Sequence, residues 1–138
     1  MIDHIGLSAA DYRRTKTFYE QALAPLGYVV RMEIPGSGGD MAACGFSAGA
    51  NGNPDFWIAG EGKTGPALHV AFEARERSAV DAFHAAALAA GGRDNGAPGI
   101  RAKYHPNYYA AFVLDPDGHN IEAVCHSPGA ATDQKSFW

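Results

Sequence analysis

The sequence has 138 residues, enough for one domain or for two half-size modules that share a core. Its 46% of hydrophobic and 19% of charged residues are typical of a globular protein. The net charge of -4, without a basic cluster, argues against binding to nucleic acid, whose phosphates need a dense basic surface.

Two further features bear on where the protein works. No apolar stretch approaches the roughly 20 residues that a membrane helix needs, so we expect no membrane contact. Residues 1–4 lack the basic start and apolar run of a signal peptide. We therefore expect a cytoplasmic protein in which Cys44 and Cys125 are reduced and buried.

The first half of the sequence predicts a strand, a helix and three more strands. Residues 2–7 read as a strand with His4 and Gly6 on one face. Asp11 is a suitable N-cap for a helix whose apolar residues recur at helical spacing up to Leu26. The remaining strands are expected over residues 28–34, 41–46 and 56–59.

The second half repeats this order after a linker over residues 60–66. A strand over residues 68–72 precedes a second helix, at whose start Ser78 and Asp81 resemble a capping box. Strands over residues 109–114 and 121–124 flank a segment whose Asp-Pro-Asp-Gly sequence is typical of a type I turn.

The two halves are copies of one another. When segment 4–7 is placed over segment 69–72, their first histidines coincide, and the same shift also aligns Phe18 with Phe83, Leu23 with Leu88 and Gly27 with Gly92. Such repetition predicts the architecture. We expect an α+β fold of two paired βαβββ modules in one domain over residues 1–138, with modules at about 1–60 and 67–126 and a tail at 127–138. The helix of each module covers one face of its sheet, so the other face needs a partner or a ligand.

The repeat also predicts a metal site. Two equivalent histidines can meet near a pseudo-two-fold axis, and the same shift places Glu122 on Trp57. Two imidazoles and one carboxylate suit Fe, Mn, Ni, Co or Zn and leave coordination positions open. A carboxylate among apolar residues is rarely buried unless it is paired or bound to a metal. We predict that His4, His69 and Glu122 bind one divalent metal, with Trp57 as an apolar wall opposite Glu122 for a flat substrate.

These residues resemble the vicinal oxygen chelate superfamily, which includes glyoxalases, extradiol dioxygenases, fosfomycin-resistance enzymes and bleomycin-binding proteins. The resemblance covers residues 1 to about 126 and rests on His4, the Phe18-Tyr19 pair, His69 and the segment from Leu114 to Glu122. It implies paired modules that form a cupped mixed sheet around a divalent metal, with helices on the outer face. The metal chelates two neighbouring oxygens of a small-molecule substrate. A homodimer is also implied, with the modules paired within one chain or exchanged between chains.

Departures from the individual groups leave the reaction open. Glyoxalases of this fold use a second carboxylate from the strand that here holds Trp57. Fosfomycin-resistance enzymes surround the phosphonate with Ser, Lys and Arg, whereas segment 102–111 has Lys103 and no serine. Extradiol dioxygenases share the three-ligand set. We expect an enzyme of the dioxygenase type or a lyase or isomerase, with a ligand-sequestering protein of the bleomycin-resistance type as the alternative.

The aromatic segment 104–109 supplies the remaining candidates. His105 is the expected catalytic base, because an imidazole titrates near neutral pH, and Tyr108 or Tyr104 comes second. The candidate substrate-binding residues are Trp57, Tyr104, Tyr108 and Phe112.

Overall fold

The computed structural model describes residues 1–37, 41–49 and 52–129, so most of the predicted tail, residues 130–138, lies outside the described part. The elements in chain order are β1 (Ile5–Ala9), α1 (Tyr12–Leu23), η1 (Ala24–Leu26), β2 (Tyr28–Pro35), β3 (Met41–Ala48), β4 (Phe56–Gly60), β5 (His69–Glu73), α2 (Arg77–Ala89), β6 (Arg93–Ile100), β7 (Tyr109–Leu114) and β8 (Asn120–Cys125). None of the described helices is long and apolar enough to cross a membrane.

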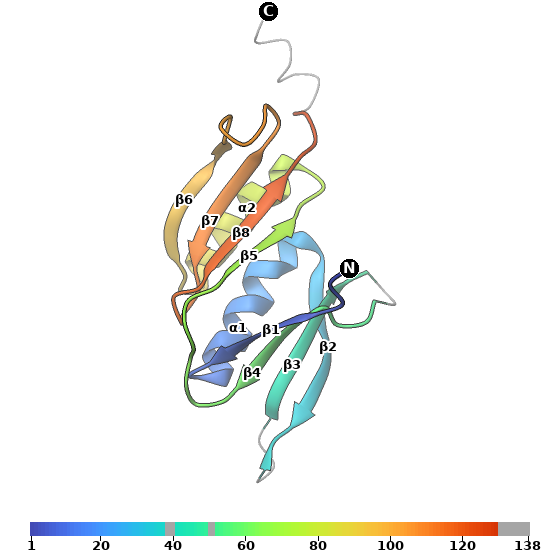
Figure 1. Cartoon of the computed structure of the whole chain (residues 1–138), viewed down its shortest axis with the longest axis vertical. Helices are drawn as coiled ribbons and strands as arrows, with labels where there is room; N and C mark the ends of the chain where they lie inside the picture. Colours follow the sequence, from blue (N-terminus) through green and yellow to red (C-terminus); the bar gives the residue numbers. More distant parts are fainter. Residues whose placement is uncertain (38–40, 50–51, 130–138) are drawn as a thin grey trace, which may run out of the picture.

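The strands form two sheets with the same topology, β1-β4-β3-β2 and β5-β8-β7-β6 (Figure 1). In each sheet the first strand pairs in parallel with the last strand of its own half, and the other pairs are antiparallel. The predicted α+β class with two βαβββ units is confirmed. The repeat places β1 and β5 at equivalent edges of the two sheets.

A helix covers one face of each sheet. Asp11 caps α1 as predicted, because its carboxylate accepts a hydrogen bond from the backbone N–H of Arg14 at 3.2 Å. Phe18 and Tyr19 on that helix are fully buried, and the Tyr19 ring lies 5.0 Å from the ring of Phe56 on β4. Residues that alternate with these core positions on the strands therefore point to the helix-free face.

The predicted capping box at the start of α2 is wrong. Glu76 is the N-cap residue, and its side chain makes no capping hydrogen bond. The two residues of the expected box have other partners: the hydroxyl of Ser78 donates to the Glu76 carboxylate at 3.3 Å, and Asp81 accepts a hydrogen bond from the hydroxyl of Tyr109 at 2.5 Å. A tertiary contact to β7 thus takes the carboxylate that a cap would need.

The turn between β7 and β8 joins the two halves of the chain. Asp115 is buried and accepts from the hydroxyl of Tyr19 at 2.5 Å and from the backbone N–H groups of Asp117 and His119 at 2.9 Å each. Asp117 in turn accepts from the hydroxyl of Thr15 at 3.2 Å. Both carboxylates of the Asp-Pro-Asp-Gly segment therefore bind α1 of the other half.

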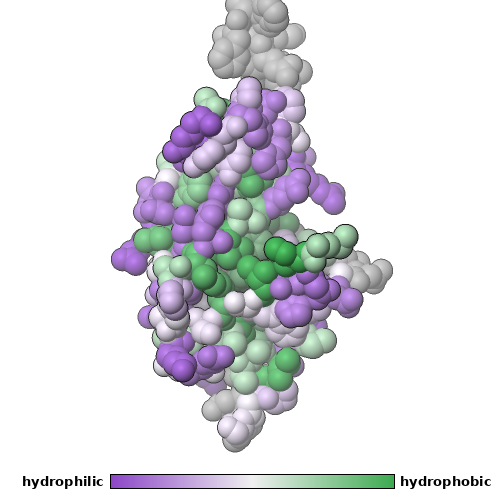
Figure 2. Space-filling model, in the orientation of Figure 1, coloured by the Kyte–Doolittle hydropathy of each residue, from purple (hydrophilic) through white to green (hydrophobic). Residues whose placement is uncertain are grey.

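The two halves of the chain pack against each other through their helices and through apolar side chains. The ring of Phe72 on β5 lies 5.1 Å from the ring of Phe56 and 5.2 Å from the ring of Tyr28, and the two helices also pack against each other. One apolar core therefore runs through both halves. Figure 2 shows apolar surface across the middle of the molecule and mostly polar surface above it.

Candidate functional site

The predicted ligands His69 and Glu122 lie together on the helix-free face of the second sheet. The Nε2 atom of His69 is 3.0 Å from Oε1 of Glu122. The Glu122 side chain is only 2% exposed, whereas that of His69 is 50% exposed. The two strands that carry them, β5 and β8, are parallel neighbours, with Ala71 opposite Glu122. A nearly buried carboxylate thus faces an imidazole that solvent reaches.

Asn120 fixes the orientation of His69. The Nδ1 atom of His69 lies 3.0 Å from the backbone oxygen of Asn120, and because a carbonyl only accepts, this nitrogen carries the hydrogen. In the neutral ring Nε2 then presents a lone pair to the Glu122 carboxylate. Two acceptors this close need a positive charge, either a proton or a metal ion. The backbone carbonyl behind the ring is the kind of second partner that metal-bound histidines have.

Tyr108 is the second partner of Glu122. Its hydroxyl donates a hydrogen bond to Oε2, the oxygen that His69 does not contact. Burial, followed by this hydrogen bond and the nearby negative charge, raises the pKa of Tyr108 to about 12. The hydroxyl therefore remains protonated at neutral pH and acts as a donor. Tyr108 was a candidate from the sequence, but its contact with Glu122 could not be predicted, because Tyr108 follows a loop without a regular residue pattern.

His105 lies behind Tyr108, in a small aromatic cluster. Its ring is 5.3 Å from the Tyr108 ring, edge to face, and its Nε2 atom is 2.7 Å from Nδ1 of His126. Its Nδ1 accepts from the backbone N–H of Asn107 at 3.1 Å. Both ring nitrogens of the predicted base are thus engaged away from Glu122. His126, which sequence reasoning did not assign to the site, is part of the cluster. Tyr104 is 57% exposed, and its ring lies 4.8 Å from that of Tyr108.

His4, the third predicted ligand, is not with the other two in the single chain. Its side chain is 59% exposed, and its Nδ1 atom lies 2.6 Å from the carboxylate of Asp3. Ile2, Asp3 and Ile5 line a shallow groove with residues 70–73, so the start of β1 lies beside the later part of β5. His69 opens β5. Among the described residues no three His, Cys, Asp or Glu side chains are grouped as a metal would need.

Trp57 lies on the helix-free face of the first sheet. Its neighbours in β4, Phe56 and Ile58, are buried in the core, so the indole points the other way. The ring lies over Gly45 of β3, where an added Cβ would come within 2.8 Å of Cζ2. Because Gly45 has no side chain, the indole can pack closely on the backbone of β3. Its predicted stacking on a substrate stays a prediction.

Phe112 on β7 pairs with Glu122 in register and lies on the same face. The ring of His69 is 6.3 Å from its ring, at 26° between their planes. On the other side, the guanidinium carbon of Arg101 lies 5.4 Å from the centre of the Phe112 ring. Phe112 therefore separates the His69–Glu122 pair from a cation that sequence reasoning did not select.

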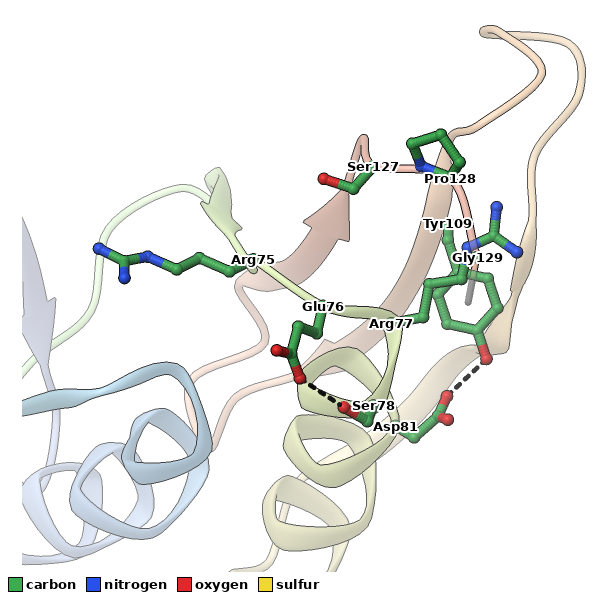
Figure 3. Close-up of a pocket in the computed structure, with 9 residues that line it drawn as sticks. All are labelled: Arg75, Glu76, Arg77, Ser78, Asp81, Tyr109, Ser127, Pro128 and Gly129. Atoms are coloured by element: carbon green, nitrogen blue, oxygen red, sulfur yellow. Dashed lines mark hydrogen bonds between the residues drawn. The ribbon is translucent and has the colours of Figure 1, made fainter. Parts of the chain in front are cut away.

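A separate cavity of about 760 Å³ lies at the start of α2, between Arg75, Ser127 and the residues around them (Figure 3). Two of its lining side chains contact Tyr109: Asp81 accepts a hydrogen bond from the Tyr109 hydroxyl, and the Arg77 guanidinium lies 5.2 Å from the centre of the Tyr109 ring. Neither His69 nor Glu122 lines it.

The His69–Glu122 pair fits a divalent metal. Two ligands that each lie about 2.0–2.2 Å from a metal, at right angles, are about 3 Å apart, and the two side-chain atoms are 3.0 Å apart. The donors are one imidazole nitrogen and one carboxylate oxygen, which suits metals from iron to zinc. A third ligand must come from elsewhere.

The sequence matches the family model described as the Glyoxalase/Bleomycin resistance protein/Dioxygenase superfamily over residues 1–123. The chain belongs to this superfamily. The resemblance drawn from the histidines and the Asp-Pro-Asp-Gly segment is confirmed. The comparison with curated proteins gives no match.

Solved structures of the superfamily resemble the chain over nearly its whole length. A glyoxalase/bleomycin resistance protein from Albidiferax ferrireducens T118 is 27% identical, with a TM-score of 0.68 over 91% of this chain and 98% of that one. TioX from Micromonospora sp. ML1 is 16% identical, with a TM-score of 0.68 over 92% and 99%. Lactoylglutathione lyase from Agrobacterium tumefaciens is 18% identical, with a TM-score of 0.62 over 91% and 92%. At these lower identities the likeness concerns the fold.

Proposed function

We propose that the protein is a metal-dependent enzyme that chelates a small oxygenated substrate through a divalent metal bound by His69, Glu122 and His4. The observation that carries this proposal is the His69–Glu122 pair, in which Nε2 of His69 lies 3.0 Å from Oε1 of Glu122 on the helix-free face of the sheet and Nδ1 is held by a backbone carbonyl. When bound, the metal would polarise substrate oxygens as a Lewis acid and hold two of them in place.

We further propose that His4 reaches this pair from a second copy of the chain. His4 is exposed just before β1, and the helix of each half covers only one face of its sheet. In a two-fold dimer with exchanged modules, the first module of each copy would face the second module of the other. Each dimer would then contain two sites, each with one His4 and the His69–Glu122 pair of the other copy.

The surrounding residues have distinct proposed roles. Tyr108 orients Glu122 through its hydroxyl, and Phe112 with Trp57 gives apolar surface for a flat substrate. Tyr104 covers the outer side of Tyr108. His105 remains our proposed proton acceptor, with His126 to share the proton over the 2.7 Å contact between their rings.

The class of reaction lies between two alternatives of the superfamily. Ring-cleaving dioxygenation needs the three ligands and open positions for a diol and for O2, which is the oxidant. A lyase or isomerase reaction needs a proton acceptor, and Trp57 stands where glyoxalases of this fold have a second carboxylate, so His105 would have to supply it. The rival is a binding protein without chemistry. The paired and oriented donors of His69 and Glu122 favour the enzyme, because a protein that only sequesters a ligand has no use for them.

Metal content tests the proposal. Protein purified without a polyhistidine tag and without added metal should contain close to one divalent ion per chain. His69→Gln and Glu122→Gln should each lose most of it, because two remaining ligands bind far more weakly than three. His84→Gln is the matched control, since His84 pairs with Asp94 on the helix side of the second sheet and should retain the metal. Equal metal content in all four proteins, or none in the wild type after addition of zinc, would contradict the proposal.

A further inference from the structure

Arg101 lies next to the candidate site, beyond Phe112, and forms no ion pair with a carboxylate in the described part of the chain. Arg101 follows β6, and its Nη2 and Nη1 atoms donate to the backbone oxygens of Ala97 at 2.7 Å and Gly99 at 2.9 Å. Among the described residues no carboxylate lies within ion-pair distance of it. Two carbonyls satisfy two of the five guanidinium donors and none of its charge.

The backbone of β6 is shaped to hold this guanidinium on the site face. Cβ atoms added at Gly96 or Gly99 would lie 3.2 Å from Nη2 or Nη1, so the absence of side chains at both positions makes room for the group. Gly96 has a φ of +152°, and the register of β6 with β7 shifts on either side of it. The backbone N–H of Arg101 also donates to the backbone oxygen of Tyr108 at 2.7 Å. This hydrogen bond fixes Arg101 beside Tyr108, at the base of the loop between them.

The sheet register places the cation relative to the metal ligands. Glu122 pairs with Phe112, and Phe112 pairs with Gly96, in one row across β8, β7 and β6. Adjacent strands are about 4.8 Å apart, so the row from Glu122 to Gly96 spans about 10 Å. The order along the face is a metal-ligand pair, an aromatic ring and a guanidinium. When the contact distances to the ligand pair and to the guanidinium are subtracted, the remaining space fits about one aromatic ring or a short chain.

We propose that Arg101 binds the acidic group of the substrate, a carboxylate or a phosphonate, while the chelating oxygens lie at His69 and Glu122 and the middle of the substrate lies on Phe112. This inference rests on the proposed function for the position of the other end of the substrate. Arginine suits the task because its planar donors bind such groups by two parallel hydrogen bonds. Lys103, the other cation of this loop, lies 5.1 Å from the centre of the ring of the exposed Tyr104.

Calorimetry with four probes tests the inference on zinc-loaded wild-type protein. The probes are catechol, 3,4-dihydroxybenzoate, 3,4-dihydroxyphenylphosphonate and benzoate. An acid group that meets Arg101 should make at least one of the acidic diols bind about tenfold or more tightly than catechol. Arg101→Gln should abolish this difference and leave the dissociation constant of catechol and the zinc content unchanged. Arg101→Lys should keep part of it. Lys103→Gln is the control for general charge and should keep all of it.

The outcomes separate this inference from the proposed function. If the acidic diols and catechol bind equally well, or the preference survives in Arg101→Gln with an unchanged melting temperature, the inference is overturned while metal chelation stands. If none of the three diols needs zinc for binding but benzoate binding depends on Arg101, the anion site is supported and the proposed chelation fails. If Arg101→Gln lowers the melting temperature and weakens the binding of all four probes alike, Arg101 has only a structural role in the loop, and the inference is overturned. The tighter of the two acidic diols identifies the acid class.

Discussion

At the scale of residues, the segment that identifies the superfamily serves mainly to join the two halves. Asp115 and Asp117 bind α1, and His119 accepts from the backbone N–H of Leu68, just before β5, at 2.9 Å. Glu122 alone among the acidic residues of this segment faces the candidate site. The sequence could predict that Glu122 needs a partner, since a carboxylate in an apolar strand is rarely buried alone. It could not predict that Tyr108 is that partner, because the loop carrying Tyr108 has no regular period.

Removing the Tyr19 hydroxyl tests the joint. Tyr19→Phe leaves the buried Asp115 carboxylate without one of its three donors, and we expect the free energy of unfolding to fall by about 1–3 kcal/mol. Urea denaturation followed by circular dichroism measures the change. Tyr104→Phe, on a side chain that is 57% exposed, should stay within about 0.5 kcal/mol of wild type. Equal stability of both variants would mean that the bond between Tyr19 and Asp115 contributes nothing.

At the scale of elements, most of the fold follows from patterns of two and 3.6 residues. Helices α1 and α2 and strands β7 and β8 lie where apolar periodicity puts them. Strand β6 had no such signal. Its sequence, Arg-Asp-Asn-Gly-Ala-Pro-Gly-Ile, neither alternates nor favours a strand, and pairing with β7 alone keeps it extended. The same irregular backbone holds the Arg101 guanidinium. Because the sequence of β6 has no periodic pattern, it predicted neither the strand nor the position of Arg101.

A side chain at Gly96 should disturb β6. An added Cβ would lie 2.9 Å from Cδ2 of Phe112, on a backbone whose φ of +152° strains any other residue. Gly96→Ala should therefore lower the free energy of unfolding by about 1–3 kcal/mol. Gly65→Ala is the control, because nothing lies within 4 Å of a Cβ there and the backbone is ordinary, and it should be neutral or slightly stabilising. Thermal melting of the two variants distinguishes them. Similar melting temperatures would show that β6 accommodates the methyl group.

At the scale of the whole molecule, the residues of the proposed site lie on two separate sheets of the single chain. His69 and Glu122 share one helix-free face, Trp57 lies on the other, and His4 is exposed just before β1. The repeat predicted equivalent histidines, but it could not decide between pairing within a chain and exchange between chains, because both satisfy the same pattern. The packing of α1 on α2 within one chain favours exchange. We expect a dimer by light scattering at micromolar concentration, and a monomer would contradict this.

Complementation between two inactive variants tests the central claim most directly. His4→Ala and Glu122→Gln chains should each bind little metal alone. Unfolded together in equal amounts and refolded, they should recover about a quarter of the wild-type metal content. Half of the dimers are then mixed, and each mixed dimer regains one of its two sites. Metal content that stays at the average of the two separate variants, although exchange of chains is verified by mass spectrometry, would contradict the claim that two copies complete one site.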